Sequence, residues 1–122
     1  MKENVAQQKS FTFAVRIVRL YRFLLTHKES RLIAGQLLRS GTSIGANVEE
    51  AQGAVSRKDF INKMSIAYKE SRETHYWLRL FHECGLFSDR MFSSMCADCD
   101  ELSRLLFSII ASTRSTTGIQ RN

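Results

Sequence analysis

Residues 56–86 read SRKDFINKMSIAYKESRETHYWLRLFHECGL, and small or apolar side chains recur in this stretch at alternating steps of four and three. That spacing keeps one stripe of a helix facing a partner helix. The stripe consists of Phe60, Met64, Ala67, Ser71, Thr74, Leu78 and Phe81. Ser56 is placed to cap the start of the helix, and Gly85 is placed just beyond its end. The stretch therefore predicts an amphipathic helix over residues 57–84.

Three further segments show the same spacing and predict helices over about residues 10–28, 30–54 and 88–113. In the earliest, Ser10 is the expected N-cap. The expected core stripe of that helix is Phe11, Ala14, Val18, Tyr21 and Leu25, widened by Ile17 and Leu24. The next helix contains four glycines, each costing about 1 kcal/mol relative to alanine, so we expect a neighbouring helix to approach it closely.

The whole chain is expected to be one domain, because its 122 residues and 14.0 kDa match the size of a single hydrophobic core. The sequence has no proline to interrupt a helix and no strand signal. Four amphipathic helices with short links predict an all-α, antiparallel up-down four-helix bundle. Residues 114–122 are expected to form a frayed polar tail.

The composition also bears on the cellular compartment. No apolar run approaches the roughly 18 residues that a membrane span needs. The opening residues MKENVAQQKS lack the hydrophobic segment of a signal peptide. The three cysteines are an odd number, which argues against a disulfide framework. We therefore expect a cytoplasmic protein with free thiols and no contact with a membrane.

The net charge of +6 lies entirely in the first 40 residues. That part of the chain has eight basic and two acidic residues, whereas the remainder has ten of each. The candidate nucleic-acid-binding residues are Lys9, Arg16, Arg19 and Arg22, which lie outside or at the flank of the expected core stripe. Phosphate neutralisation dominates nucleic-acid affinity, so this patch favours polyanionic partners without implying sequence specificity.

A second apolar face predicts self-association. Ile66, Trp77, Leu80 and Cys84 fall within about 60° of one another, opposite the core stripe of helix 57–84. Phe13, Leu20 and Phe23 likewise extend beyond the expected core side of helix 10–28. A slightly rotated helix could absorb some of these residues into the core. An oligomer interface is the favoured interpretation, and two stripes on one helix fit a ring in which each subunit meets two neighbours.

Motifs for catalysis or metal binding are weak. Cys96 and Cys99 have zinc-ligand spacing, but a structural zinc site needs four ligands and the sequence has no second pair. Arg22 and His27 match the Arg-x4-His spacing of HEPN-type ribonucleases, although five residues separate such a pair by about 140° on a straight helix. We therefore expect no enzyme activity, no metal, no cofactor and no small-molecule substrate.

Three stretches resemble a known family. The run QLLRSGTSIGANVEEA (residues 36–51), followed by SRKDFI (56–61) and AYKES (67–71), is similar to the bacterial four-helix-bundle family of 23S rRNA intervening-sequence proteins, which are sometimes labelled ribosomal-protein-like. The resemblance covers about residues 10–113. Its motif residues here, to which we assign a structural role, are Gln36, Arg39, Ser43, Asn47 and Glu50. Gln36, Ser43 and Asn47 lie with Ser40 along one edge of the core stripe, where we expect hydrogen bonds between helices or subunits. Arg39 and Glu50 are expected to face outward.

The resemblance implies an up-down bundle that assembles as a ring, with a homopentamer favoured. It also implies that some members are encoded within insertions of 23S rRNA genes. Members of a related branch are accessory proteins of diversity-generating retroelements, which bind a reverse transcriptase and nucleic acid. The family has no established catalytic residues to transfer to this chain.

The leading hypothesis is a non-enzymatic ring that binds RNA, DNA or a nucleoprotein through the basic surface of helix 10–28. A protein-interaction scaffold that binds an acidic protein is the first alternative, and a HEPN-like ribonuclease is the second. Binding of generic RNA at graded salt separates the first hypothesis from the scaffold, whose pull-down would survive nuclease treatment. Loss of RNA cleavage in His27→Ala would support the ribonuclease.

Overall fold

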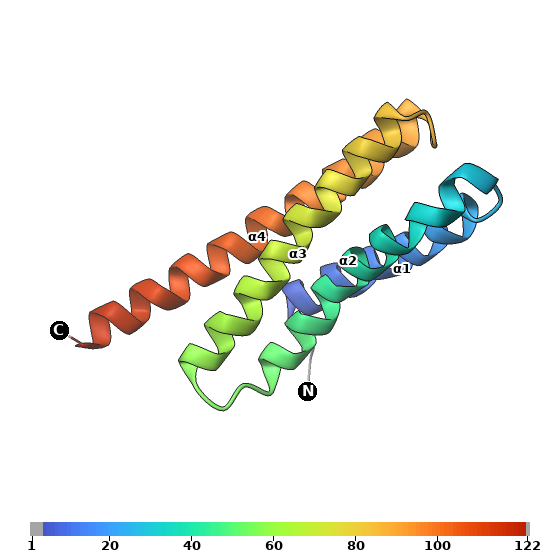
Figure 1. Ribbon diagram of the computed structural model, residues 1–122. Coiled ribbons are helices and arrows are strands. Elements are labelled where there is room, and N and C mark those ends of the chain that lie inside the picture. The colour runs from blue at the N-terminus through green and yellow to red at the C-terminus, as the bar shows by residue number, and fades with distance from the viewer. Residues whose placement is uncertain (1–3, 122) are drawn as a thin grey trace.

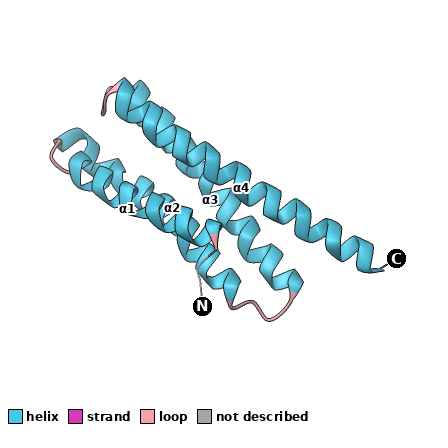
Figure 2. Ribbon diagram, turned by 180° about the vertical axis from the view of Figure 1, so that it is seen from behind, coloured by secondary structure: helices cyan, strands magenta, loops and turns pink. Residues whose placement is uncertain are grey.

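The structure is a computed structural model that describes residues 4–121, with side chains described through Ser115. It contains four helices, which are α1 (Val5–Leu24), α2 (Lys28–Gln52), α3 (Arg57–Glu83) and α4 (Asp89–Arg121). Helices α1 and α2 form one hairpin, α3 and α4 form another, and the two hairpins pack side by side (Figures 1 and 2). The all-α four-helix class predicted from the sequence is confirmed, and residues 4–121 contain no strand.

Helix α1 begins five residues earlier than expected because Asn4, and not Ser10, is its N-cap. The Asn4 side-chain oxygen accepts a hydrogen bond from the Gln7 backbone N–H at 2.8 Å, and the Gln7 side chain accepts one from the Asn4 N–H at 3.0 Å. This reciprocal pair satisfies two N–H groups that have no partner within the helix. Ser10 lies one turn further on and is buried in the core.

The core face of α1 is shifted by one residue from the expected stripe. Phe13 is only 2% exposed and Leu20 only 4%, so the expectation that they lie outside the core is wrong. Phe11, expected in the core, is 68% exposed. Both series have four-three spacing, and a shift of one residue turns a helix by about 100°. The residues of α1 that the bundle buries are Ala6, Ser10, Phe13, Ile17, Leu20 and Leu24.

Two glycines of α2 allow it to approach α1 closely. A methyl group at Gly41 would lie 2.6 Å from Ile17 Cγ1, and one at Gly45 would lie 3.2 Å from the Ser10 carbonyl oxygen. These separations are below ordinary van der Waals contact, so the close approach expected from the glycines is confirmed at both positions. Gly35 has nothing within 4 Å of an added methyl group and serves no such purpose.

Helix α3 buries the stripe predicted for it from Met64 to Phe81, while Phe60 is half-buried. It ends at Glu83, and Gly85 follows two residues later with a φ of 75°, which suits a residue without a side chain. The Gly85 N–H donates to the His82 carbonyl, and the Leu86 N–H donates to the Phe81 carbonyl, both at 3.0 Å. These two bonds form a Schellman motif that turns the chain into α4.

Helix α4 continues to Arg121, whereas the sequence analysis expected a helix to residue 113 and a polar tail. No proline interrupts this segment, and Gly118 is its residue of lowest helix propensity. The C-terminal turns of α4 extend past the ends of the neighbouring helices (Figures 1 and 2). The predicted tail is therefore helical as far as the structure describes it.

Candidate nucleic-acid interface

Half of the expected basic patch on α1 is neutralised by α4. The Lys9 ammonium lies 2.8 Å from Glu101 Oε1, and the Arg16 guanidinium lies 2.5 Å from Asp98 Oδ2. Arg16 also donates to the Ser94 hydroxyl at 2.9 Å. These contacts join the first helix to the last across the open side of the bundle. Lys9 and Arg16 are therefore linked to α4 and are less available to a phosphate than the sequence suggested.

The other half of the patch remains available. Arg19 and Arg22 are exposed and lie three residues apart, which makes them neighbours on the surface of α1. Among the described residues, no carboxylate pairs with either side chain. An unpaired guanidinium keeps all its N–H donors free for planar anions such as phosphate. Of the four predicted residues, these two fit a nucleic-acid contact.

A groove of about 560 Å³ lies between α3 and α4 and was not predicted from the sequence. Its basic side chains are Arg72, Arg79 and Arg104, with His75 between the first two. Its other lining residues are Tyr68, Asp100, Ser103 and Phe107. The spacing 68, 72, 75 and 79 follows one face of a helix, and this is the signal that could have identified the α3 wall.

Three positive side chains face one negative side chain in this groove. Asp100 lies 3.6 Å from His75 Nε2, and no arginine of the groove forms an ion pair with a described carboxylate. Arg72 donates to the Tyr68 hydroxyl at 3.4 Å. Phe107 is 60% exposed and contacts the Tyr68 ring with centroids 5.8 Å apart. The groove thus combines positive charge with exposed aromatic surface.

The predicted apolar face on α3 is partly covered by the chain itself. Trp77 is half-buried, contacts the Phe81 ring at a centroid distance of 6.0 Å and donates from its indole N–H to Glu73 at 2.9 Å. Ile66 is also half-buried, whereas Leu80 is 36% exposed and Cys84 is exposed.

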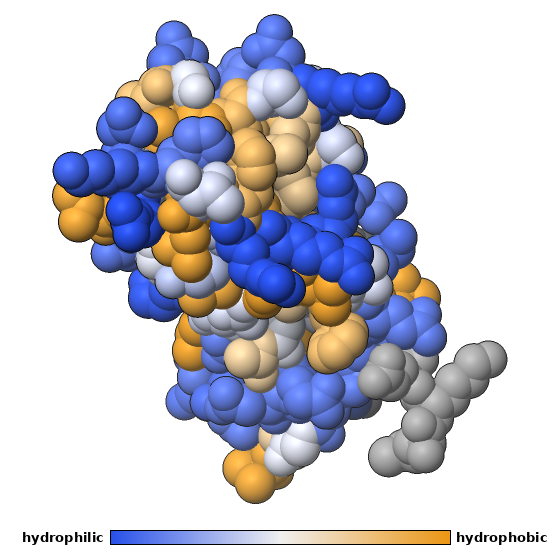
Figure 3. Space-filling model, turned by 90° about the vertical axis from the view of Figure 1, so that its right-hand side faces the viewer, coloured by the Kyte–Doolittle hydropathy of each residue, from blue (hydrophilic) through white to orange (hydrophobic). Residues whose placement is uncertain are grey.

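Apolar side chains of the α1–α2 hairpin also reach the surface. Phe23 of α1 is 39% exposed, and Leu32 of α2 is 92% exposed. Figure 3 looks at the end of the bundle where the α1–α2 and α3–α4 turns lie, and it shows apolar side chains between hydrophilic ones.

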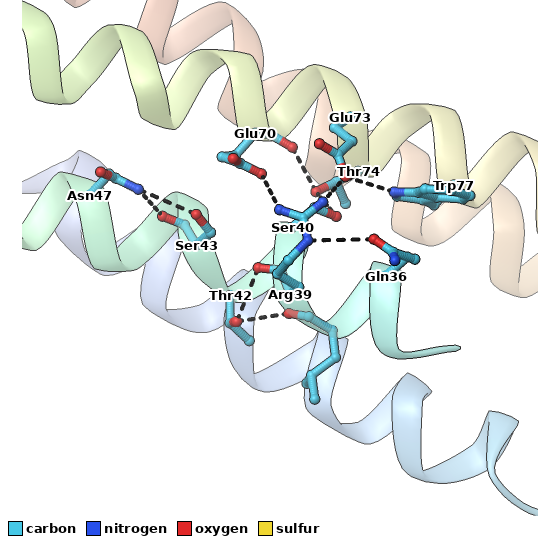
Figure 4. A network of polar contacts seen from close by, with 11 residues as sticks. Gln36, Arg39, Ser40, Thr42, Ser43, Asn47, Glu70, Glu73, Thr74 and Trp77 are labelled. Carbon is cyan, nitrogen blue, oxygen red and sulfur yellow. Dashed lines mark hydrogen bonds and ion pairs between the residues drawn. The ribbon is translucent and has the colours of Figure 1, made fainter. Parts of the chain in front are cut away.

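The motif residue Arg39 reaches from α2 to α3, whereas the sequence analysis placed it facing outward. Its guanidinium pairs with Glu70 at 3.2 Å and with Glu73, while Gln36 accepts a hydrogen bond from its Nε at 3.5 Å (Figure 4). Nearby, the buried Thr74 hydroxyl donates to Ser40 at 3.0 Å. These polar contacts fix α2 against α3.

The remaining motif residues also have partners. The Asn47 side-chain amide donates to the Ser43 carbonyl oxygen at 2.8 Å, within the same helix (Figure 4). Glu50 lies 3.0 Å from Lys63 Nζ, and this carboxylate raises the pKa of the Lys63 ammonium. Glu50 is exposed, as expected, and its carboxylate also forms an ion pair with α3. The Glu50–Lys63 pair thus joins α2 to α3, whereas the Asn47–Ser43 hydrogen bond lies within α2.

The two cysteines with metal-ligand spacing lie in the core. Burial raises the pKa of the Cys99 thiol to about 12 and also raises that of Cys96, so neither provides a thiolate near neutral pH. Among the described residues, no three His, Cys, Asp or Glu side chains are grouped closely enough to hold a metal ion.

Arg22 and His27 do not share a helix, whereas the comparison with HEPN-type ribonucleases placed both on helix 10–28. Arg22 lies on α1, whereas His27 is the N-cap residue of α2 and its ring contacts Phe23. No contact between Arg22 and His27 is present in the described part of the chain.

Comparison with known proteins identifies relatives. The sequence model of the 23S rRNA-intervening sequence protein family matches residues 2–108. A crystal structure of a protein of unknown function from the S23 ribosomal protein family of Bacteroides thetaiotaomicron VPI-5482 is 49% identical in sequence, with a TM-score of 0.84. The match covers 87% of this chain and 98% of that one. No curated protein matches the sequence.

No helix within the described residues is long and apolar enough to cross a membrane.

Proposed function

Because the chain belongs to the 23S rRNA-intervening sequence protein family, we propose that it is a non-enzymatic, homo-oligomeric module that binds RNA through exposed arginines. The observation that carries this proposal is the pairing pattern on α1. Lys9 and Arg16 are joined to carboxylates of α4, whereas Arg19 and Arg22 are exposed without a described acidic partner. Guanidinium groups in that state suit phosphate oxygens, and they confer affinity without sequence specificity.

Repetition of the same surface around an oligomer strengthens this binding. Each copy adds its own arginines, and contacts made by linked sites reinforce one another.

We propose a ring, with a pentamer favoured by the family resemblance. Its interface uses the apolar side chains that the monomer leaves partly uncovered. These are Phe23, Ile66, Trp77, Leu80 and Cys84. Phe13 and Leu20 are excluded from this interface because the core of the monomer already buries them.

The chemistry of the described side chains supports a binding role over an enzymatic one. The two core cysteines keep their protons near neutral pH, and Arg22 lies on α1 whereas His27 lies in the turn that leads into α2. The carboxylates of Glu50, Glu70 and Glu73 are engaged in ion pairs with basic side chains. We place the action of the protein in the cytoplasm, where a partner derived from ribosomal RNA would be found.

The test is RNA binding by Arg19→Gln/Arg22→Gln. Generic RNA should bind the wild-type protein, and the double variant should bind more weakly with a salt slope lower by about 2, because each lost phosphate contact removes about one counterion. Arg57→Gln/Lys58→Gln is the matched control, since these exposed side chains lie at the start of α3 and the net charge changes equally. An unchanged affinity in the α1 variant would contradict the proposed surface.

The same preparations decide between RNA and an acidic protein partner. RNA bound to the purified wild-type protein should disappear after nuclease treatment, together with any protein that co-purifies through it. An acidic protein that stays bound after nuclease treatment, combined with no RNA binding, would replace the RNA proposal by the scaffold alternative.

A further inference from the structure

We propose that the groove between α3 and α4 binds single-stranded RNA, with its arginines on phosphates and Phe107 stacked on a base. This inference deepens the proposed function and rests on it. The groove walls come from two antiparallel helices, and the α3 wall runs from Tyr68 to Arg79. At 1.5 Å per residue that wall is about 16 Å long, which gives an extended strand room to lie along it.

The arginines are positioned to follow a phosphate backbone. Arg72 and Arg79 are separated by two helical turns on α3, and Arg104 projects from α4 into the same groove. None of them has an ion-pair partner among the described residues. Asp100 is the one carboxylate lining the groove, and its neighbour is His75 at 3.6 Å. A carboxylate in this place can accept a hydrogen bond from a base amino group.

The aromatic side chains distinguish this groove from a purely basic surface. Phe107 is 60% exposed although it is a large apolar residue, and it packs against Tyr68 at a tilt of 53°. An exposed ring beside guanidinium groups is the combination with which proteins bind unpaired bases. A duplex hides its base faces, and an acidic peptide has no base to stack. The two features together therefore favour single-stranded RNA.

The experiment compares Phe107→Ala with the wild-type protein on a single-stranded oligonucleotide and on a duplex of equal length. Loss of one stacked base should weaken single-strand binding roughly 5- to 150-fold, while duplex binding stays the same. Because Phe107 is largely exposed, its removal should leave the thermal midpoint nearly unchanged. Phe11→Ala is the matched control, since Phe11 is an exposed phenylalanine on α1, outside the groove.

A second pair of variants tests the arginines. Arg72→Gln/Arg104→Gln should lower the salt slope of single-strand binding by about 2, whereas Arg57→Gln/Lys58→Gln should leave the slope unchanged. Equal single-strand affinities for Phe107→Ala and the wild type would overturn the groove proposal while leaving RNA binding by α1 intact. Absence of RNA binding by the wild-type protein would overturn the proposed function itself.

Oligomer mass and an acidic peptide complete the test. The groove variants should keep the mass of the wild-type oligomer. A fall in mass would overturn the inference, because the groove would then be a contact between subunits. The inference would also be overturned if polyglutamate bound as tightly as RNA and if Phe107→Ala did not change that binding. Such a result would favour an acidic protein partner.

Discussion

Replacing Gly41 by alanine tests the close packing of α1 on α2, and the structure gives the size of the effect. The new methyl carbon would lie 2.6 Å from Ile17 Cγ1 and 2.8 Å from both Cδ1 and Cγ2. Favourable carbon–carbon contacts are about 3.5–4.0 Å long. Ile17 is fully buried, so its side chain has no free space into which it can turn. Overpacking of such a site costs about 1–3 kcal/mol.

The same substitution removes a glycine from a helix, which alone would stabilise the protein by about 1 kcal/mol. Because three carbon atoms clash at once, we take the upper half of the overpacking range. After the gain from removing the glycine is subtracted, the free energy of unfolding should fall by about 1–2 kcal/mol. Urea unfolding measures this loss as a lower midpoint at an unchanged slope. Gly35→Ala is the matched control in the same helix. Its methyl group meets nothing within 4 Å, so it should stabilise by about 0.5–1 kcal/mol.

A double-mutant cycle shows whether the loss comes from this contact. Ile17→Ala removes all three carbon atoms that the new methyl group would meet. Added to Gly41→Ala, it should cost less than the two single losses together. The packing of α1 on α2 is refuted if Gly41→Ala stabilises the protein as much as Gly35→Ala does.

Four further perturbations have definite expected outcomes. Arg39→Ala should lower the free energy of unfolding by about 1 kcal/mol, which is the upper end for exposed ion pairs, because Glu70 is only 12% exposed and loses its partner. An unchanged urea midpoint would contradict a stabilising role for the Arg39 ion pair. Leu80→Glu should yield folded monomers by light scattering, and an unchanged oligomer mass would refute the α3 interface. At about pH 8 a thiol reagent should modify the exposed Cys84 and spare Cys99 in the native protein, whereas rapid loss of the Cys99 thiol would show that the core is open. The free energy of unfolding should fall as the pH rises from about 9 to about 12. The reason is that the Cys99 thiol loses its proton above its ordinary pKa of 9.0 in the unfolded chain, whereas burial raises its pKa to about 12 in the folded protein. Cys99→Ala should show a smaller fall in urea midpoint over this pH range, and an equal fall would exclude this thiol as the cause.

The fold could be predicted where the sequence offered a single consistent stripe. Helix α3 has one unbroken four-three series that was assigned to the core, together with a serine cap and a glycine beyond its end, and its buried face is the predicted one. Helix α1 has two apolar series one residue apart, so periodicity alone did not decide whether Phe11 or Phe13 faces the core. The structure places Phe13 in the core, in the same series as Ile17. Ile17 lies against α2 at Gly41, where the absence of a side chain gives it room.

The candidate site was less predictable because it depends on contacts between distant residues. The charge count on α1 could not show that Asp98 and Glu101 of α4 neutralise Arg16 and Lys9. The groove was missed for the opposite reason. Its arginines are divided between α3 and α4, in a part of the chain with no net charge, and only the packing of those helices brings them together.

The salt dependence of RNA binding by the wild-type protein tests the central claim most directly. The measurement is the affinity for a generic single-stranded RNA between about 50 and 200 mM salt, by fluorescence anisotropy. Binding through arginines predicts that the logarithm of the association constant falls linearly with the logarithm of the salt concentration. Absence of binding at the lowest salt, or an affinity that salt does not change, would contradict the account.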